Sequence, residues 1–152
     1  MTGLSTLVCS SYVVVAYELA MKTKVLLIDD EKGFTELLRV NLEETGQFEV
    51  RVKKWAEDAW GAAKEFQPNI ILLDLIMPRM PGGNVAAQLE ADPQLREIPI
   101  VFMTAGVRPD IVKENEGVIC GRPCLAKPMT IDEVRQTIAT HLRRPSVSPA
   151  IS

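Results

Sequence analysis

The chain has 152 residues, about the length of one ordinary domain, and can bury an apolar core without disulfides or a structural metal. Its formal net charge of −3 offers no basic surface, so we expect no direct nucleic-acid partner. The three cysteines form no Cys-x-x-Cys pair, and the single histidine argues against a His-rich zinc site and Ser-His-Asp catalysis. A reducing, cytoplasmic location is therefore expected.

The two ends of the chain differ in composition from the rest. Residues 12–17 are apolar, but the stretch is too short to span a bilayer, and no basic residue precedes it as in a secretory signal. We expect an N-terminal extension of uncertain role over 1–20, a folded domain over 21–143 and a disordered tail over 144–152. We expect no association with a membrane.

The first half of the domain is predicted to alternate strands with helices. Residues 25–28 form a continuous apolar run, as expected of a strand covered on both faces. Helical spacing of apolar residues predicts a helix over 32–45, with Gly46 as its stop. The apolar stripe of this helix is Phe34, Leu37, Leu38 and Leu42. Residues 48–52 alternate like a strand near a sheet edge, and a helix over 57–66 follows.

The second half repeats this alternation. The apolar run 70–73 predicts a central strand, and a helix over 85–90 follows it. A strand over 98–102 comes next. Prolines and glycines up to Gly121 leave room for only a short helix over 111–115.

The domain is predicted to end in a short strand over 124–126 and a capped helix. Thr130 can cap this helix, with Glu133 three residues further on. The apolar residues of the helix are Ile131, Val134, Ile138 and Leu142. His141 then reads as a cation near a helix C-terminus. Strands that alternate with about five helices predict a three-layer α/β fold with right-handed crossovers.

Polar residues follow four of the predicted strands. Asp29 and Asp30 follow the first strand, Asp74 the third, Thr104 the fourth and Lys127 the fifth. If the strands are parallel, these residues share the sheet edge at which open α/β sheets bind ligands. Carboxylates so close together repel one another and raise one another's pKa, so a hard divalent cation is their natural partner.

Each of these residues also has an ordinary structural explanation. Asp29 and Asp30 could cap the first helix, and Asp74 could cap a turn. Thr104 could simply end a strand, and Lys127 could be a solvated surface charge. Four separate coincidences at four strand ends weigh against this alternative.

The ordered set of motifs resembles the receiver domain of bacterial two-component response regulators. The motifs are Asp29-Asp30, Asp74 with Met77-Pro78 and Gly82 after it, Thr104-Ala105, and Lys127-Pro128. The resemblance covers about residues 22–142. It implies a flavodoxin-like fold, with a five-stranded parallel sheet in the order 2-1-3-4-5 and about five helices.

The resemblance also implies a magnesium-dependent chemistry. The implied Mg²⁺ ligands are Asp30 and Asp74 directly, Asp29 partly through water, and the main-chain carbonyl of Ile76. Asp74 would accept a phosphoryl group from a phosphohistidine on a sensor histidine kinase or phosphotransfer protein. Lys127 would neutralise charge on the phosphoryl oxygens, and the Thr104 hydroxyl would donate to one of them.

The resemblance further implies a switch in a protein-binding surface. Phosphorylation would draw in the loop after Thr104, and a downstream protein partner would detect the change. Many relatives have an aromatic switch residue three positions before the lysine, where this chain has Cys124. We therefore expect an unusual output face, with Cys124 as a small buried hydrophobic residue. Dimerisation on phosphorylation stays open.

Three functions stay open. The leading hypothesis is a stand-alone receiver, which is not a conventional enzyme and which binds a partner or relays phosphate. A magnesium-dependent phosphatase or phosphotransferase usually needs a carboxylate two residues after Asp74, where Ile76 stands. A phosphorylation-independent adaptor would have a vestigial site, against which Thr104 and Lys127 argue. The chain could also be part of a longer regulator or hybrid kinase, with the tail as a linker.

Overall fold

The computed structural model of the chain describes Val13 and residues 21–119 and 121–142. The predicted extension over 1–20, Val13 apart, and the predicted tail over 144–152 lie outside these residues and stay predictions. Cys9 and Cys120 lie outside them as well. Within the described ranges, no helix is long and apolar enough to cross a membrane.

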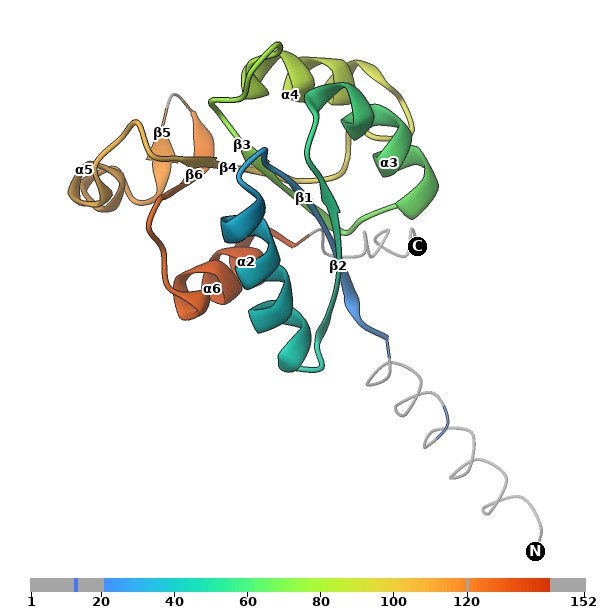
Figure 1. Cartoon of the computed structure of the whole chain (residues 1–152), viewed down its shortest axis with the longest axis horizontal. Helices are drawn as coiled ribbons and strands as arrows, with labels where there is room; N and C mark the ends of the chain where they lie inside the picture. The colour runs from blue at the N-terminus through green and yellow to red at the C-terminus, as the bar shows by residue number, and fades with distance from the viewer. Residues whose placement is uncertain (1–12, 14–20, 120, 143–152) are drawn as a thin grey trace, which may run out of the picture.

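Strands and helices alternate along the described ranges (Figure 1). The strands are β1 (Thr23–Ile28), β2 (Phe48–Lys53), β3 (Ile70–Asp74), β4 (Ile100–Thr104), β5 (Val118–Ile119) and β6 (Arg122–Ala126). The helices are α2 (Lys32–Glu44), the short 3₁₀ helix η1 (Ala56–Asp58), α3 (Ala59–Phe66), α4 (Gly82–Ala91), α5 (Pro109–Glu114) and α6 (Ile131–His141).

The strands form one sheet in the order β2-β1-β3-β4-β6-β5. Neighbours from β2 to β6 are parallel, so the predicted flavodoxin-like order is confirmed with β6 as the fifth parallel strand. The prediction of only five strands is wrong, because β5 pairs antiparallel with β6 at the edge. Gly117 and Gly121 flank β5 and both have a φ of 76°, which glycine adopts readily. A two-residue strand is too short for alternation to reveal it.

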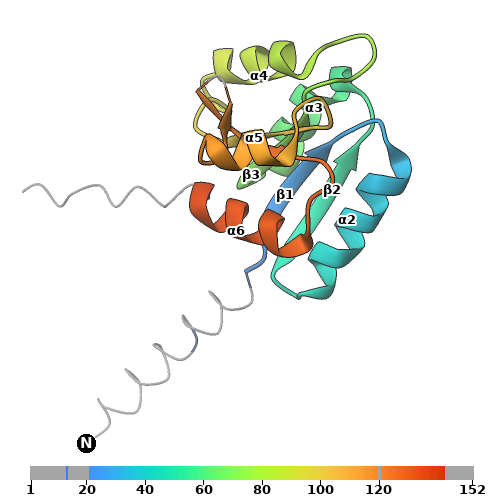
Figure 2. The same cartoon turned by 90° about the vertical axis from the view of Figure 1, so that its left-hand side faces the viewer.

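Helices cover both faces of the sheet, as the three-layer prediction requires. Figures 1 and 2 show α2 and α6 on one face and α3 and α4 on the other. Leu26 and Ile28 of β1 pack on the α3–α4 side, whereas Val25 and Leu27 pack on the α2–α6 side. Each of these side chains is fully buried, and such burial stabilises a fold by about 1.5–3 kcal/mol per residue. The central strands are therefore rigid supports for the residues at their ends.

One predicted core position in the first helix is wrong. The Leu37 side chain is 63% exposed, whereas Leu38 and Leu42 of the same helix are buried. Consecutive helical residues point roughly 100° apart, so a helix that buries Leu38 and Leu42 turns Leu37 toward solvent.

Among the element boundaries that differ from the prediction, two have a clear local cause. Helix α4 begins at Gly82 rather than at residue 85, because glycine permits a close approach to β3 that is described below. Strand β4 begins at Ile100 rather than at residue 98. The Ile98 amide donates to the Leu95 carbonyl at 3.0 Å, so Ile98 belongs to a turn.

The predicted cap of the last helix is confirmed. The Thr130 hydroxyl accepts from the Glu133 amide at 3.2 Å, and the Glu133 carboxylate accepts from the Thr130 amide at 2.8 Å. Such a cap stabilises a helix by roughly 0.5–2 kcal/mol. It fixes the start of α6, whose Val134 and Ile138 are buried against the sheet.

Candidate functional site

The five polar residues predicted from the strand ends lie at one edge of the sheet. Asp29 and Asp30 follow β1, and Asp74 and Thr104 are the last residues of β3 and β4. Lys127 follows β6, and its amide donates to the Thr104 carbonyl at 2.8 Å. Because β1, β3, β4 and β6 are parallel neighbours, their carboxyl ends meet.

Three of these residues form an acidic cluster. Carboxylate oxygens of Asp29, Asp30 and Asp74 all lie within 4.8 Å of one another. Asp29 and Asp74 are buried, and Asp30 is half-buried. Clustered carboxylate oxygens at the edge of solvent suit Mg²⁺, which prefers oxygen ligands and retains several waters. The donor set therefore fits the predicted cation.

Lys127 is drawn into this cluster. Its Nζ lies 2.5 Å from Asp29 Oδ2 and 3.5 Å from Asp74 Oδ2, and it also lies 3.6 Å from Glu31 Oε2. The ammonium sits 4.5 Å from the centre of the Phe34 ring. The Lys127 side chain is only 11% exposed, so it is not a solvated surface charge.

The pKa values of both Asp74 and Lys127 are raised in this cluster. Burial raises the pKa of Asp74 and the charge of Asp29 raises it further, although the Ile76 amide and Lys127 act in the opposite direction. Burial alone would lower the pKa of Lys127, but its hydrogen bond to Asp29 and the nearby carboxylates raise it overall. The lysine is therefore held as a cation beside carboxylates that repel one another.

The loop after β3 orients the Asp74 carboxylate. Asp74 Oδ1 accepts from the Ile76 amide at 3.1 Å, and the Ile76 side chain is 67% exposed. The Gly82 amide donates to the Leu75 carbonyl at 3.0 Å. A Cβ at Gly82 would lie 2.3 Å from the Asp74 carbonyl oxygen, so only glycine fits there. The ligand role of the Ile76 carbonyl stays a prediction.

Thr104 lies within reach of the same loop. Its side chain is buried, and its hydroxyl oxygen accepts from the Gly106 amide at 2.9 Å. A Cβ at Gly106 would lie 3.3 Å from Thr104 Oγ1 and 3.2 Å from Ile76 Cδ1. Residues from the β3 and β4 loops are thus neighbours above the sheet edge. The Thr104 hydroxyl keeps its own proton to donate.

Asp29 also has a purely structural role near the start of α2, close to the helix cap that the sequence allows. Its Oδ1 accepts from the Glu31 amide at 2.9 Å, which stabilises the turn into α2. Its other oxygen, Oδ2, is the one that contacts Lys127. Asp29 therefore has both a structural contact and a place in the acidic cluster.

Cys124 lies in β6 and packs in the core on the α3–α4 side. It is buried, and burial raises the pKa of its thiol, as expected for a small hydrophobic residue. Its predicted role in a switch stays a prediction.

Sequence reasoning missed two neighbours of the site, Glu31 and Phe34. Both contact the Lys127 ammonium. Apolar spacing alone places Phe34 on the buried stripe of α2, and its position in the first turn after Asp29 and Asp30 is the signal that indicates a place beside the site. Beside it lies a cavity of about 410 Å³ between α2 and the start of α6.

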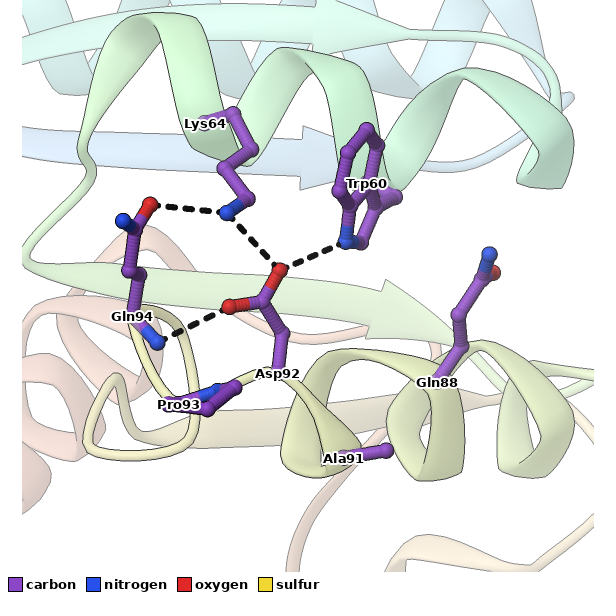
Figure 3. Close-up of a pocket in the computed structure, with 7 residues that line it drawn as sticks. All are labelled: Trp60, Lys64, Gln88, Ala91, Asp92, Pro93 and Gln94. Carbon is purple, nitrogen blue, oxygen red and sulfur yellow. Dashed lines mark hydrogen bonds and ion pairs between the residues drawn. The ribbon is translucent and has the colours of Figure 1, made fainter.

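A second hollow lies between α3 and the turn after α4 (Figure 3). Asp92 Oδ2 accepts from Trp60 Nε1 at 2.8 Å and lies 2.9 Å from Lys64 Nζ. Its Oδ1 accepts from the Gln94 amide at 2.8 Å, and the hydrogen bond from Lys64 is the main reason that the pKa of Asp92 is lowered. The polar groups of this hollow bond to one another, so the network connects α3 to the turn after α4.

Comparison with known proteins gives one consistent family. Residues 25–139 match the profile described as the response regulator receiver domain. Response regulator Rre1 of Synechocystis is 30% identical over 132 residues, which are 86% of this chain and 56% of that protein. DNA-binding response regulator MtrA of Mycobacterium tuberculosis is 32% identical over 131 residues, 86% of this chain and 55% of that protein. The chain thus spans about half the length of these relatives.

Solved structures give the same fold. Chemotaxis protein CheY4 of Vibrio cholerae has a TM-score of 0.68 and 24% identity, covering 80% of this chain and all (100%) of that chain. The signal receiver domain of a modulated diguanylate cyclase from Desulfovibrio desulfuricans has a TM-score of 0.63 and 26% identity. That match covers 80% of this chain and 94% of the other.

Proposed function

This chain belongs to the response regulator receiver domain family, and on that premise we propose that Asp74 is its phosphoacceptor. The phosphoryl group would come from a sensor histidine kinase or a phosphotransfer protein. The observation that carries the proposal is the position of Lys127 Nζ, 2.5 Å from Asp29 and 3.5 Å from Asp74, within the acidic cluster. Buried groups of opposite charge at the end of parallel strands favour phosphoryl transfer over a purely structural role.

The proposed transfer is a displacement at phosphorus. An oxygen of the Asp74 carboxylate attacks the phosphorus of a phosphohistidine, a new O–P bond forms, and the P–N bond breaks. The electron pair of the broken bond returns to the histidine ring of the donor. The product is an aspartyl phosphate on Asp74, which then carries the signal.

Charge control at the site is proposed to come from Lys127 and a divalent cation. The residues that would hold Mg²⁺ are Asp29, Asp30, Asp74 and the Ile76 carbonyl. Bound there, the ion supplies positive charge against the phosphoryl oxygens. Lys127 supplies a second positive charge from within the protein, and burial makes that charge more effective than it would be in water.

Thr104 is proposed to convert phosphorylation into a change of shape. Its hydroxyl can donate to a phosphoryl oxygen on Asp74 while its oxygen still accepts from Gly106. A contact of that kind would draw the loop after β4 toward β3 and alter the surface seen by a protein partner. Moving such a surface from almost fully off to almost fully on requires about 5.5 kcal/mol of differential stabilisation.

As a signalling domain, the protein would catalyse only its own phosphorylation and the hydrolysis of its own aspartyl phosphate. The exposed, apolar Ile76 stands where an aspartyl-phosphate phosphatase usually has its acid/base carboxylate, which disfavours that alternative. For the same reason we expect slow self-hydrolysis. MtrA is named as a DNA-binding regulator, so the absence of a nucleic-acid partner is proposed for the described domain alone.

Intact mass spectrometry tests the proposal. The protein is incubated with acetyl phosphate and Mg²⁺, beside an Asp74→Asn variant and a chelated control. We expect a labile gain of one phosphoryl group in the wild-type protein only. An equal gain in the Asp74→Asn variant would place the phosphoryl group on another residue and contradict the proposal. No gain in a folded protein that binds Mg²⁺ would favour either strict dependence on a kinase or the vestigial adaptor.

A further inference from the structure

At the edge of the sheet that carries the acidic cluster, the loops after β2 and β3 both place a cation over the ring of Trp55. Trp55 lies between β2 and α3, where it is the N-terminal cap residue of η1. Lys54 Nζ lies 4.6 Å from the centre of the Trp55 ring, and the guanidinium carbon of Arg79 lies 4.7 Å from it. Arg79 comes from the loop between β3 and α4. We call Lys54, Trp55 and Arg79 the basic rim.

Arg79 has an unusual backbone conformation. Its φ is 73°, in the left-handed region that disfavours side chains, and the Met80 amide donates to the Pro78 carbonyl at 2.9 Å. This bond closes a γ-turn of the rare type with positive φ. The Arg79 side chain is 66% exposed, so burial does not offset the strain. Strain of this kind at a residue other than glycine is concentrated at functional positions.

The cations of the basic rim are poorly neutralised. Among the described residues, Arg79 has one carboxylate within 4.0 Å, Glu57 at 3.8 Å, and Lys54 has none. By comparison, the half-buried Lys64 lies 2.9 Å from Asp92 and is paired more closely than either cation of the rim. The rim therefore presents positive charge around a half-buried aromatic ring on a chain whose net charge is −3.

We propose that the basic rim binds an acidic segment of a protein partner. Carboxylates of the partner pair with Lys54 and Arg79, and an apolar side chain beside them packs against Trp55. A nucleic acid is disfavoured, because two cations on a chain of net charge −3 are too few to hold a long phosphate backbone, whereas they can pair with the few carboxylates of a short acidic segment. The proposed binding does not require phosphorylation.

Trp55 itself can report the binding. The chain has two tryptophans, so a Trp60→Phe background leaves Trp55 as the single emitter. The probe is a short synthetic peptide rich in aspartate and glutamate with one central leucine, titrated at low and at physiological salt. The test variants in this background are Lys54→Glu with Arg79→Glu, and the milder pair Lys54→Gln with Arg79→Gln. The matched control is Lys113→Glu, an exposed lysine on α5.

We expect the peptide to shift the Trp55 emission and to bind more weakly as salt rises. Charge reversal should weaken binding by roughly tenfold or more, neutralisation by less, and Lys113→Glu should leave it unchanged. Equal affinity in all variants, or no emission change at low salt, would overturn the proposal. Tighter binding of a single-stranded oligonucleotide at the same two cations would overturn it in favour of a nucleic acid.

Discussion

Lys127 determines the charge balance of the acidic cluster, because its Nζ contacts Asp29 and lies near Asp74. We predict that Lys127→Ala slows phosphorylation by acetyl phosphate at saturating Mg²⁺ by roughly a hundredfold or more, as when a charge-stabilising donor is removed. The measurement is the rate of mass gain. Lys113→Ala, which removes a lysine far from the cluster in sequence, is the control. An unchanged rate in Lys127→Ala would show that the lysine does not contribute to phosphoryl transfer.

Gly82 and its neighbour Gly83 provide a matched pair. A Cβ at Gly82 would lie 2.3 Å from the Asp74 carbonyl oxygen, whereas nothing lies within 4 Å of a Cβ at Gly83. We predict that Gly82→Ala lowers the free energy of unfolding by about 1–3 kcal/mol through overpacking. Gly83→Ala should be neutral or should stabilise α4 by up to about 1 kcal/mol. Urea denaturation measures both, and equal effects would contradict the predicted close approach.

At the scale of elements, a side-chain pair joins β6 to α4. Arg122 contacts the Glu90 carboxylate with two nitrogens, one of them at 3.0 Å, and lies over the Phe102 ring. The hydrogen bond from Arg122 lowers the pKa of Glu90. Both side chains are more than a third exposed, so solvent screening limits the pair to roughly 0–1 kcal/mol.

The lowered pKa of Glu90 fixes the sign of its pH dependence. The stabilisation is fully present above the ordinary pKa of 4.5 and is lost as pH falls through the lower pKa of the folded state. We predict that wild-type protein exceeds Glu90→Gln in unfolding free energy at pH 7 and that the difference disappears in acid. A difference that is constant with pH would mean that the pair acts through packing alone.

At the scale of the whole molecule, the raised pKa of Asp74 means that its ionised carboxylate lowers the stability of the metal-free fold. The pKa of Asp74 is raised by burial and by Asp29, so the folded state loses stability as pH rises above the ordinary value of 3.8. We therefore predict that Asp74→Asn is more stable than wild type at pH 7 without Mg²⁺ and that the two converge below pH 3.8. A higher unfolding free energy for wild type than for Asp74→Asn at pH 7 without Mg²⁺ would contradict this prediction.

Magnesium should stabilise the wild-type fold by linkage. A ligand at a hundred times its dissociation constant adds about 2.7 kcal/mol to the free energy of unfolding. We expect Mg²⁺ to raise the urea midpoint of wild-type protein more than sodium chloride of equal ionic strength does. A smaller rise is expected for Asp30→Asn, because a proposed ligand is lost. Equal effects of the two salts on wild-type protein would contradict specific Mg²⁺ binding at the acidic cluster.

The sequence predicted the parallel sheet and the site edge because both depend on local signals. Apolar runs that end in Asp29, Asp74 or Thr104 mark strand ends, and parallel order brings such ends together. The edge strand β5 is too short to carry a periodic signal. The stacking of Arg79 on Trp55 joins loops that are distant in sequence, so no local pattern could indicate it.

The identity of the phosphorylated residue is the most direct test of the account. After incubation with acetyl phosphate and Mg²⁺, borohydride reduction converts an aspartyl phosphate to homoserine, and peptide mapping then locates the change. We predict homoserine at Asp74 and unmodified Asp29 and Asp30. Conversion at Asp29 or Asp30, with Asp74 unmodified, would contradict the assignment of the phosphoacceptor.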